Sequence, residues 1–294
     1  MIKGFVARDI VSKSGVRIHA EIGGAGPPIL LLHGWPETHL CWRKVAPGLA
    51  DAGYSVVAAD LRGYGDSDKP ASAPDHAPYS KRATAQDQVD VMAALGHARF
   101  AVFGHDRGAR VAHRMALDHA GVVERVAVLD IAPTQTMYAR TDRLFAQFYY
   151  HWFFLIQPFD LPERLIGADP AYFLRRTLGV LDGPNDVFDE ATLDEYVRCY
   201  SAPGGVHASC EDYRAAASID LKHDAEDDAA GRKIEPPLLA LWGAEGFIGR
   251  RFDAIAAWSE KARTVSGAAL DCGHFLPEER PAETLAALLN FLRA

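Results

Sequence analysis

The stretch Phe100–His113 constrains the fold of this chain more than any other. Four apolar residues, Phe100–Phe103, predict a buried strand that runs directly into Gly104-His-Asp-Arg-Gly108, and a helix is expected from there on. Glycines two before and two after a central residue suit a sharp strand-to-helix turn, because neighbouring atoms pass too close for larger side chains. The central residue, Asp106, is therefore predicted to project from the end of a sheet, at a helix N-terminus, in a strained backbone conformation.

A carboxylate at this turn indicates a particular chemistry. A serine alkoxide attacks acyl carbon, whereas a carboxylate suits the displacement of a leaving group from saturated carbon, which leaves an alkyl ester on the enzyme. The helix N-terminus favours the anionic form of Asp106. The pentapeptide alone leaves open a plainer interpretation, in which Asp106 is a loop residue that only caps the helix.

Length and composition limit the class of protein. A chain of 294 residues suits one large α/β domain or a core with an inserted subdomain. The net charge of −8, without a Lys/Arg-rich run, argues against a nucleic-acid partner. No stretch is long and apolar enough to span a bilayer, and Met1–Asp9 is too polar for a signal peptide, so we expect a cytoplasmic protein with no membrane partner. The four cysteines lack metal-ligand spacing, which predicts reduced thiols.

Buried-strand patterns alternate with helical patterns in both halves of the chain. The predicted strands are an opening hairpin (Phe5–Ile10 and Val16–Ile22), the apolar runs Ile29–Leu32, Ser55–Ala59, Phe100–Phe103, Val126–Leu129 and Leu238–Trp242, and a short last strand at Ala268–Leu270. Helices are predicted over 80–95 and 282–292, among others. This alternation predicts a mostly parallel sheet with helices on both faces.

The alternation stops in the middle of the chain. From Thr136 to about Asp224 no buried-strand run occurs, and aromatic residues at helical spacing predict helices over 140–157, 170–178, 189–200 and 207–218. We therefore predict a helical cap domain, residues 136–224, inserted into a core domain made of residues 1–135 and 225–294. The charged segment Lys222–Arg232 is expected to return the chain to the core.

Two further residues are predicted to act with Asp106 at the carboxyl ends of the strands, where the working residues of open α/β sheets gather. An ester on Asp106 must be hydrolysed, and histidine is the natural base near neutral pH. His274, in a turn after the last strand, is the best placed. Asp130, at the end of Val126–Leu129, would orient it, although a plain turn residue before Pro133 is an equal alternative.

Hydrolysis of the ester also needs two backbone N–H groups for the oxyanion. The expected donors are Arg107, which follows the nucleophile, and a residue of the loop after Ile29–Leu32, for which we choose Trp35.

Four motifs together resemble the α/β-hydrolase superfamily over essentially the whole chain. They are His33-Gly-Trp-Pro-Glu37, Asp60-Leu-Arg-Gly-Tyr-Gly-Asp-Ser67, the aspartate-centred turn and Gly273-His-Phe275. Within the superfamily they point to the branch with an aspartate nucleophile, which comprises haloalkane and haloacetate dehalogenases and epoxide hydrolases. The resemblance implies the α/β-hydrolase fold, with a mostly parallel eight-stranded sheet and a helical cap.

One departure from the commonest family pattern concerns the acid that orients the histidine. Many relatives carry it in the loop after the strand equivalent to Leu238–Trp242, and here that loop reads Gly243-Ala-Glu-Gly-Phe247. Gly246 stands in the place of the acid, so we assign the acid to Asp130, with Glu245 as the fallback.

A pair of arginines beside the nucleophile bears on the substrate. Arg107 and Arg110 lie three residues apart, on one face of the expected helix. A cation in the first turn opposes the helix dipole at a cost of roughly 0.3–1 kcal/mol, so Arg107 calls for a reason. A solvated helix face or an internal salt bridge is one interpretation. The functional interpretation is a clamp on a substrate carboxylate, which holds the adjacent carbon in line for Asp106. A short 2-halo acid fits this clamp.

The leaving halide needs donors as well. His151 and Trp152, within an aromatic run, and Tyr213 carry N–H and O–H groups that together could solvate a small anion. The other members of the run, Tyr149, Tyr150, Phe153 and Phe154, are expected to be cap core.

The fluoroacetate (haloacetate) dehalogenases resemble the chain at all these places. The matching segments are Asp106–Arg110, Leu129–Pro133, His151-Trp152 and Trp242–Arg250. The resemblance implies hydrolysis of haloacetates to glycolate and halide, a homodimer, and no metal or organic cofactor. An epoxide hydrolase is the alternative, but such enzymes usually need two cap tyrosines, and beside Tyr213 no second is evident. A non-catalytic ligand-binding protein on the same fold is a third possibility, against which the complete Asp-His-Asp set argues.

Overall fold

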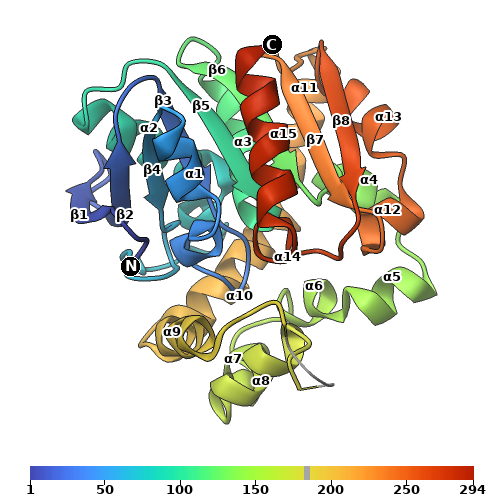
Figure 1. Cartoon of the computed structure of the whole chain (residues 1–294). Coiled ribbons are helices and arrows are strands. Elements are labelled where there is room, and N and C mark those ends of the chain that lie inside the picture. Colours follow the sequence, from blue (N-terminus) through green and yellow to red (C-terminus); the bar gives the residue numbers. More distant parts are fainter. Residues whose placement is uncertain (182–185) are drawn as a thin grey trace.

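The computed structural model describes residues 1–181 and 186–294, and its centre is one sheet (Figure 1). In this part of the chain eight strands follow the order β1-β2-β4-β3-β5-β6-β7-β8. They are β1 (Val6–Val11), β2 (Arg17–Gly24), β3 (Pro28–Leu32), β4 (Ser55–Ala59), β5 (Phe100–His105), β6 (Val123–Leu129), β7 (Leu238–Gly243) and β8 (Val265–Leu270). In the run β4-β3-β5-β6-β7-β8 neighbouring strands are parallel. Strand β2 pairs antiparallel with both of its neighbours, β1 and β4. The predicted mostly parallel eight-stranded sheet is confirmed.

The strands whose positions were predicted accurately are the ones that are fully buried. The central strands β4 and β5 are buried along their whole length, and they read as continuous apolar runs because helices cover both faces of the sheet. The edge strand β8 is mostly exposed and built largely from small residues. It begins at Val265, so the predicted short strand Ala268–Leu270 captures only its second half.

Helices of the core domain cover the two faces of the sheet. They are η1 (His39–Trp42), α1 (Ala46–Asp51), η2 (Ala77–Tyr79), α2 (Lys81–Ala94), α3 (Asp106–Asp118), α12 (Phe247–Arg251), α13 (Ala254–Ser259), α14 (Leu276–Glu279) and α15 (Pro281–Arg293). Helices α1 and α15 lie together on one face, and α2 and α3 on the other (Figure 1). The helices predicted over 80–95 and 282–292 are confirmed as α2 and α15.

The segment between β6 and β7 is helical, as predicted. Its helices are α4 (Thr134–Ala139), α5 (Arg143–Phe148), α6 (Tyr150–Phe154), α7 (Leu161–Gly167), α8 (Pro170–Thr177), α9 (Glu190–Ser201), α10 (Gly205–Ala216) and α11 (Ile219–Ala229). Helices α5–α9 lie beyond one end of the sheet (Figure 1). The single helix expected over 140–157 consists of α5 and α6, and α7 was not predicted. We propose residues 136–224 as the cap domain, although both limits fall inside helices, α4 and α11.

The charged segment Lys222–Arg232 leads the chain back to the sheet, as expected, but most of it belongs to α11, a helix that was not predicted. Arg114 of α3 explains the difference. Its Nη2 lies 2.6 Å from Asp224 Oδ1, and Asp227 binds the same guanidinium. Acidic side chains of α11 are therefore buried by pairing with a cation, which a search for apolar periodicity does not detect.

Within residues 1–181 and 186–294, no helix combines the length and apolarity that a membrane span requires. All four cysteines are buried free thiols, in agreement with the predicted reduced state.

Candidate active site

The turn between β5 and α3 has the predicted strained geometry. Asp106, the first residue of α3, has a backbone φ of 44°, a value that residues other than glycine rarely adopt. A Cβ on Gly104 would lie 2.4 Å from the carbonyl carbon of Gly108, and one on Gly108 would lie 2.5 Å from the carbonyl oxygen of His33. Both glycines are therefore required by close contact, and the turn presents Asp106 at the carboxyl end of the sheet.

The Asp106 carboxylate is fixed by the loop after β3. The backbone N–H of Trp35 donates to Asp106 Oδ1 over 3.1 Å. This approach needs glycine at position 34, because a Cβ there would lie 2.7 Å from the Cβ of Asp106. The carboxylate lines a cavity of about 190 Å³, so it meets both a backbone donor and open space.

Positive charge around Asp106 keeps it ionised. Burial by itself would raise the pKa of its carboxyl group, but nearby cationic groups outweigh burial and lower that pKa to about 2. These groups are Arg107, Arg110 and His105, joined by His274 whenever its ring is protonated. Asp106 is therefore an anion at neutral pH, as a nucleophile of this kind must be.

His274 and Asp130 are brought together as predicted. Asp130, at the end of β6, has a φ of 50° and is buried. Its Oδ2 lies 2.6 Å from His274 Nδ1, and its Oδ1 accepts the N–H of Gly243 over 2.9 Å. His274 lines the same cavity as Asp106. The carboxylate thus holds a proton on Nδ1 of His274, which leaves Nε2 as the basic nitrogen.

Gly246, at the position where many relatives carry the acid, lies close to Asp130, the acid that we assign here. A Cβ built on Gly246 would lie 3.4 Å from Asp130 Oδ1. A carboxylate carried by position 246 would therefore approach the same histidine from the next strand. Glu245, the fallback, is exposed, and no contact joins it to His274 among the described residues.

A second histidine–carboxylate pair lies beside the first, and the sequence analysis missed it. His105 Nδ1 lies 2.9 Å from Glu37 Oε2, and His105 Nε2 lies 2.9 Å from the carbonyl oxygen of His274. Both partners only accept hydrogen bonds, so both ring nitrogens carry protons. Burial opposes this charge, but the charge of Glu37 outweighs it and raises the pKa of His105 to about 9. Both residues stand inside recognised motifs, yet nothing in their spacing predicted the contact.

Arg107 makes the internal salt bridge that the sequence analysis left open. Its Nε donates to Asp212 Oδ2 over 2.6 Å, and its Nη2 donates to the backbone oxygen of the same residue over 2.8 Å. The guanidinium lies over the ring of Tyr213, 4.1 Å from its centre. Its Nη1 is buried without a hydrogen-bond partner among the described residues. Asp212, from α10, was not predicted, because a lone acidic residue in a helix carries no motif.

Arg110 has only neutral partners. Its Nη1 donates to the carbonyl oxygen of Ala132 over 3.1 Å and to Thr134 Oγ1 over 2.8 Å. No carboxylate lies within ion-pair distance anywhere in the described ranges, and Nε has no hydrogen-bond partner there. Burial and the charge of Arg107 lower the pKa of Arg110. Neither arginine is among the residues that line the cavity itself.

The predicted halide donors form one aromatic cluster with Trp35. The rings of Trp35 and His151 stack with centres 4.9 Å apart, and Tyr213 packs edge-on against both. His151 and Tyr213 line the cavity, whereas Trp152 lies behind them, buried, with its indole N–H unpartnered among the described residues. Burial lowers the pKa of His151 to about 3, so its ring is neutral at pH 7.

Tyr149 does more than the sequence analysis assigned to it. It packs against the hydrophobic core, as expected, but it also lines the cavity opposite Asp106. Burial raises the pKa of both Tyr149 and Tyr213 well above the usual value, so both hydroxyls keep their protons. The cavity therefore has two cap tyrosines, which corrects the expectation that no second one is available.

Known proteins share this architecture. Residues 27–281 match the family described as the alpha/beta hydrolase fold. A fluoroacetate dehalogenase from a Burkholderia species is 45% identical over 99% of this chain and 95% of that protein. A soluble epoxide hydrolase from Corynebacterium sp. strain C12 is 38% identical over 95% of this chain and 94% of that protein. A crystal structure from Nostoc sp. PCC 7120, provisionally described as an α/β hydrolase, shows 55% identity and a TM-score of 0.96, with 99% of each chain covered.

The family match covers most of the chain, and the two curated relatives are matched over nearly their whole length. The chain therefore belongs to the α/β-hydrolase family, a family of enzymes, as its motifs predicted.

Proposed function

We propose that this protein hydrolyses haloacetates, such as fluoroacetate and chloroacetate, to glycolate and halide through an ester on Asp106. The observation that carries the proposal is Arg110, a buried cation near the nucleophile with no carboxylate partner among the described residues. A buried charge without a counter-ion is costly, so such a site favours an anionic ligand. The unpartnered Nε of Arg110 and Nη1 of Arg107 are the donors that remain for a substrate carboxylate.

The first step is a displacement at saturated carbon. With the substrate carboxylate held by the two arginines, Asp106 Oδ2 attacks the adjacent carbon, and a C–O bond forms as the carbon–halogen bond breaks. The halide leaves with the bonding electron pair. His151, Trp152 and Tyr213 are the proposed donors that solvate it, because all three are uncharged and carry an N–H or O–H group.

The second step hydrolyses the ester. Nε2 of His274 takes a proton from water, which attacks Cγ of Asp106, while Asp130 stabilises the imidazolium. The oxyanion is held by the backbone N–H of Trp35, which already contacts this carboxylate, and by that of Arg107. The bond between Cγ and Oδ2 then breaks, Oδ2 leaves as the hydroxyl oxygen of glycolate and takes the proton from His274, and the oxygen of the water completes the restored carboxylate of Asp106.

The fluoroacetate dehalogenase relative supports this reaction, and the epoxide hydrolase relative keeps a second candidate open. The observation that favours the second is the pair Tyr149 and Tyr213 in the cavity, which could donate protons to an epoxide oxygen. The homodimer and the cytoplasmic location implied by the sequence stay predictions.

Halide release from fluoroacetate and chloroacetate, measured side by side by ion chromatography, tests the proposal, with hydration of styrene oxide as the parallel assay. We expect halide and glycolate in equal amounts, and a loss of about 10⁴-fold or more in Asp106→Ala, which lacks the nucleophile. Diol formation without halide release would instead establish the epoxide hydrolase. An Asp106→Ala variant with wild-type halide release would refute the mechanism.

A further inference from the structure

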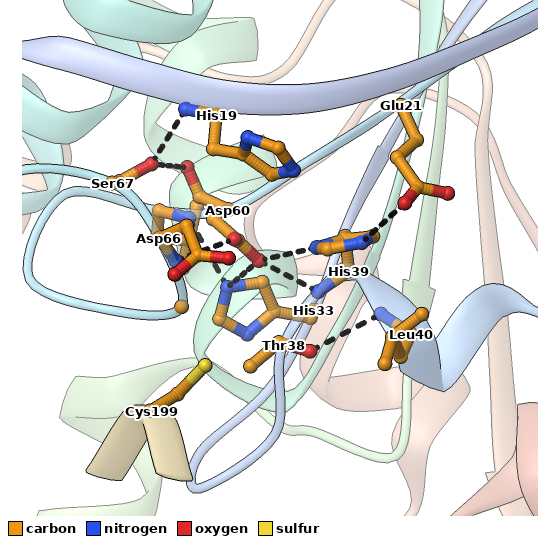
Figure 2. Close-up of polar contacts among 12 residues, drawn as sticks. His19, Glu21, His33, Thr38, His39, Leu40, Asp60, Asp66, Ser67 and Cys199 are labelled. Atoms are coloured by element: carbon orange, nitrogen blue, oxygen red, sulfur yellow. Dashed lines mark hydrogen bonds and ion pairs between the residues drawn. The ribbon is translucent and has the colours of Figure 1, made fainter. Parts of the chain in front are cut away.

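Two histidines and a glutamate gather near Asp60, outside the reaction cavity. His19 and Glu21 come from β2, two residues apart and therefore on one face of the strand, and His39 is the first residue of η1 (Figure 2). Each offers one ligand atom, and the three atoms lie within 4.8 Å of one another. None of the three residues lines the cavity.

We propose that His19, Glu21 and His39 bind one divalent transition-metal ion of the Zn²⁺ type. Imidazole nitrogen with a carboxylate oxygen is a donor set that suits such ions. Three protein ligands leave a fourth position for water.

The partners of the two imidazole rings are those expected of metal ligands. His19 Nδ1 lies 2.9 Å from Asp9 Oδ1, and His39 Nδ1 lies 2.9 Å from Asp60 Oδ1. A metal-bound histidine almost always donates its other ring N–H to a carboxylate, a carbonyl or water, which fixes the ring and raises its basicity. In both rings Nδ1 is engaged in this way, so Nε2 is the nitrogen left for the ion.

The spacing across the cluster also fits coordination of an ion. His39 is buried, and its Nε2 has no hydrogen-bond partner among the residues that the structure describes. It faces Glu21 Oε1 at 3.3 Å. Two ligand atoms on a tetrahedral Zn²⁺, with bonds of about 2.0–2.1 Å, lie about 3.3 Å apart. The other oxygen of Glu21 accepts the N–H of Ile2, which turns Oε1 towards His39.

Two buried carboxylates flank the ring of His39. Glu21 Oε1 lies 3.3 Å from its Nε2, and Asp60 Oδ1 lies 2.9 Å from its Nδ1. Buried carboxylates in proteins are paired with cations or coordinate metal ions, so this concentration of negative charge suits a divalent cation.

Bound metal would link three segments that are distant in the sequence. His19 and Glu21 belong to β2, and His19 contacts Asp9 of β1. His39 begins η1, which follows the loop after β3. Asp60, which orients His39, also accepts the N–H of Asp66 in the loop after β4. We therefore expect the ion to stabilise the fold and to take no part in the proposed reaction.

Zinc binding to the intact protein tests this inference. Protein freed of metal with a chelator is dialysed against Zn²⁺, the bound zinc per chain is measured by elemental analysis, and thermal unfolding is followed with and without zinc. The variants are His19→Gln, at a partly exposed position, and Glu21→Gln. The matched control is His207→Gln, which removes another histidine that contacts a carboxylate, Glu163, over 3.0 Å.

We expect one tightly bound zinc per chain and a higher unfolding temperature with zinc. Affinity should fall at least tenfold in His19→Gln and Glu21→Gln, and stay at the wild-type value in His207→Gln. If Glu21→Gln fails to fold, His19→Gln decides. Absence of tightly bound zinc in the wild-type protein, or equal binding by wild type and His19→Gln, would show that this cluster is not a zinc site. Halide release plays no part in this test, so the zinc site and the proposed function can fail separately.

Discussion

Two histidine–carboxylate pairs lie side by side in this enzyme, with ring centres 4.7 Å apart, and their ring nitrogens have different surroundings. In the pair of His274 and Asp130, one ring nitrogen meets the carboxylate and the ring lines the cavity. In the pair of His105 and Glu37, the ring is fully buried and its second nitrogen donates to a backbone carbonyl.

The difference shows that pairing with a carboxylate does not make a histidine a base. Among the described residues no hydrogen bond engages Nε2 of His274, so in the proposed reaction it can take a proton from water, whereas His105 has both nitrogens committed as donors. His105 is therefore a fixed positive charge beside Asp106, and it positions the backbone of His274. The role of such a histidine depends on what its other ring nitrogen, the one away from the carboxylate, contacts.

The largest expected effect separates the two histidines by function. In His274→Asn we expect ester formation without hydrolysis, so that one halide is released per active site and turnover then falls by about 10⁴-fold. Rapid-quench halide measurement and the mass of the intact protein, which should gain one carboxymethyl group, check this. His105→Gln should keep multiple turnovers, with a loss of about tenfold through positioning. Ester accumulation in His105→Gln would erase the distinction.

Moving the acid tests what the catalytic pair needs. Asp130→Asn should lower turnover by about 10³- to 10⁴-fold, because the amide cannot stabilise the imidazolium. Since position 246 lies against Oδ1 of Asp130, adding Gly246→Asp should restore at least tenfold of the lost rate, whereas adding Gly246→Asn, of the same size without charge, should not. Equal rates in the two double variants would show that charge at this place does not serve His274.

The smallest effect is a dependence of stability on pH from the buried pair. The pKa of His105 is about 9 in the folded protein, above the ordinary value of 6.5, so its contribution is complete below pH 6.5 and is lost as the pH rises through 9. At about 1.4 kcal/mol per unit of pKa, the contribution is on the order of 3 kcal/mol. Urea unfolding of wild type and Glu37→Gln between pH 6 and 10 should show the two free energies converging with rising pH. A constant gap would mean that His105 is not charged.

The features that could be predicted from the sequence are those that a local motif or a hydrophobic pattern encodes. The turn at Asp106, the strand-end position of Asp130 and the turn of His274 each carry a local signal, so the proposed catalytic set could be assembled from the sequence, and the structure brings His274 and Asp130 into contact. The central strands were equally clear because burial on both faces demands apolar residues throughout.

The residues that were missed act through contacts between distant segments. Asp212 meets Arg107 across 105 positions, and Glu37 meets His105 across 68. Neither distance leaves a spacing that can be recognised in one sequence. Helix α11 was missed for a related reason, since its buried face is acidic and is explained only by Arg114.

The single N–H of Trp35 makes the two oxygens of Asp106 inequivalent before any substrate arrives. In the proposed reaction, the oxygen it holds becomes the carbonyl oxygen of the ester, and the other becomes the bridging oxygen. The hydroxyl oxygen of the first glycolate is thus an atom of the protein itself, and an oxygen atom from water then replaces it in the carboxylate of Asp106. Each enzyme molecule would exchange its nucleophilic oxygen with solvent once per turnover, so that its catalytic side chain is continually rebuilt from water.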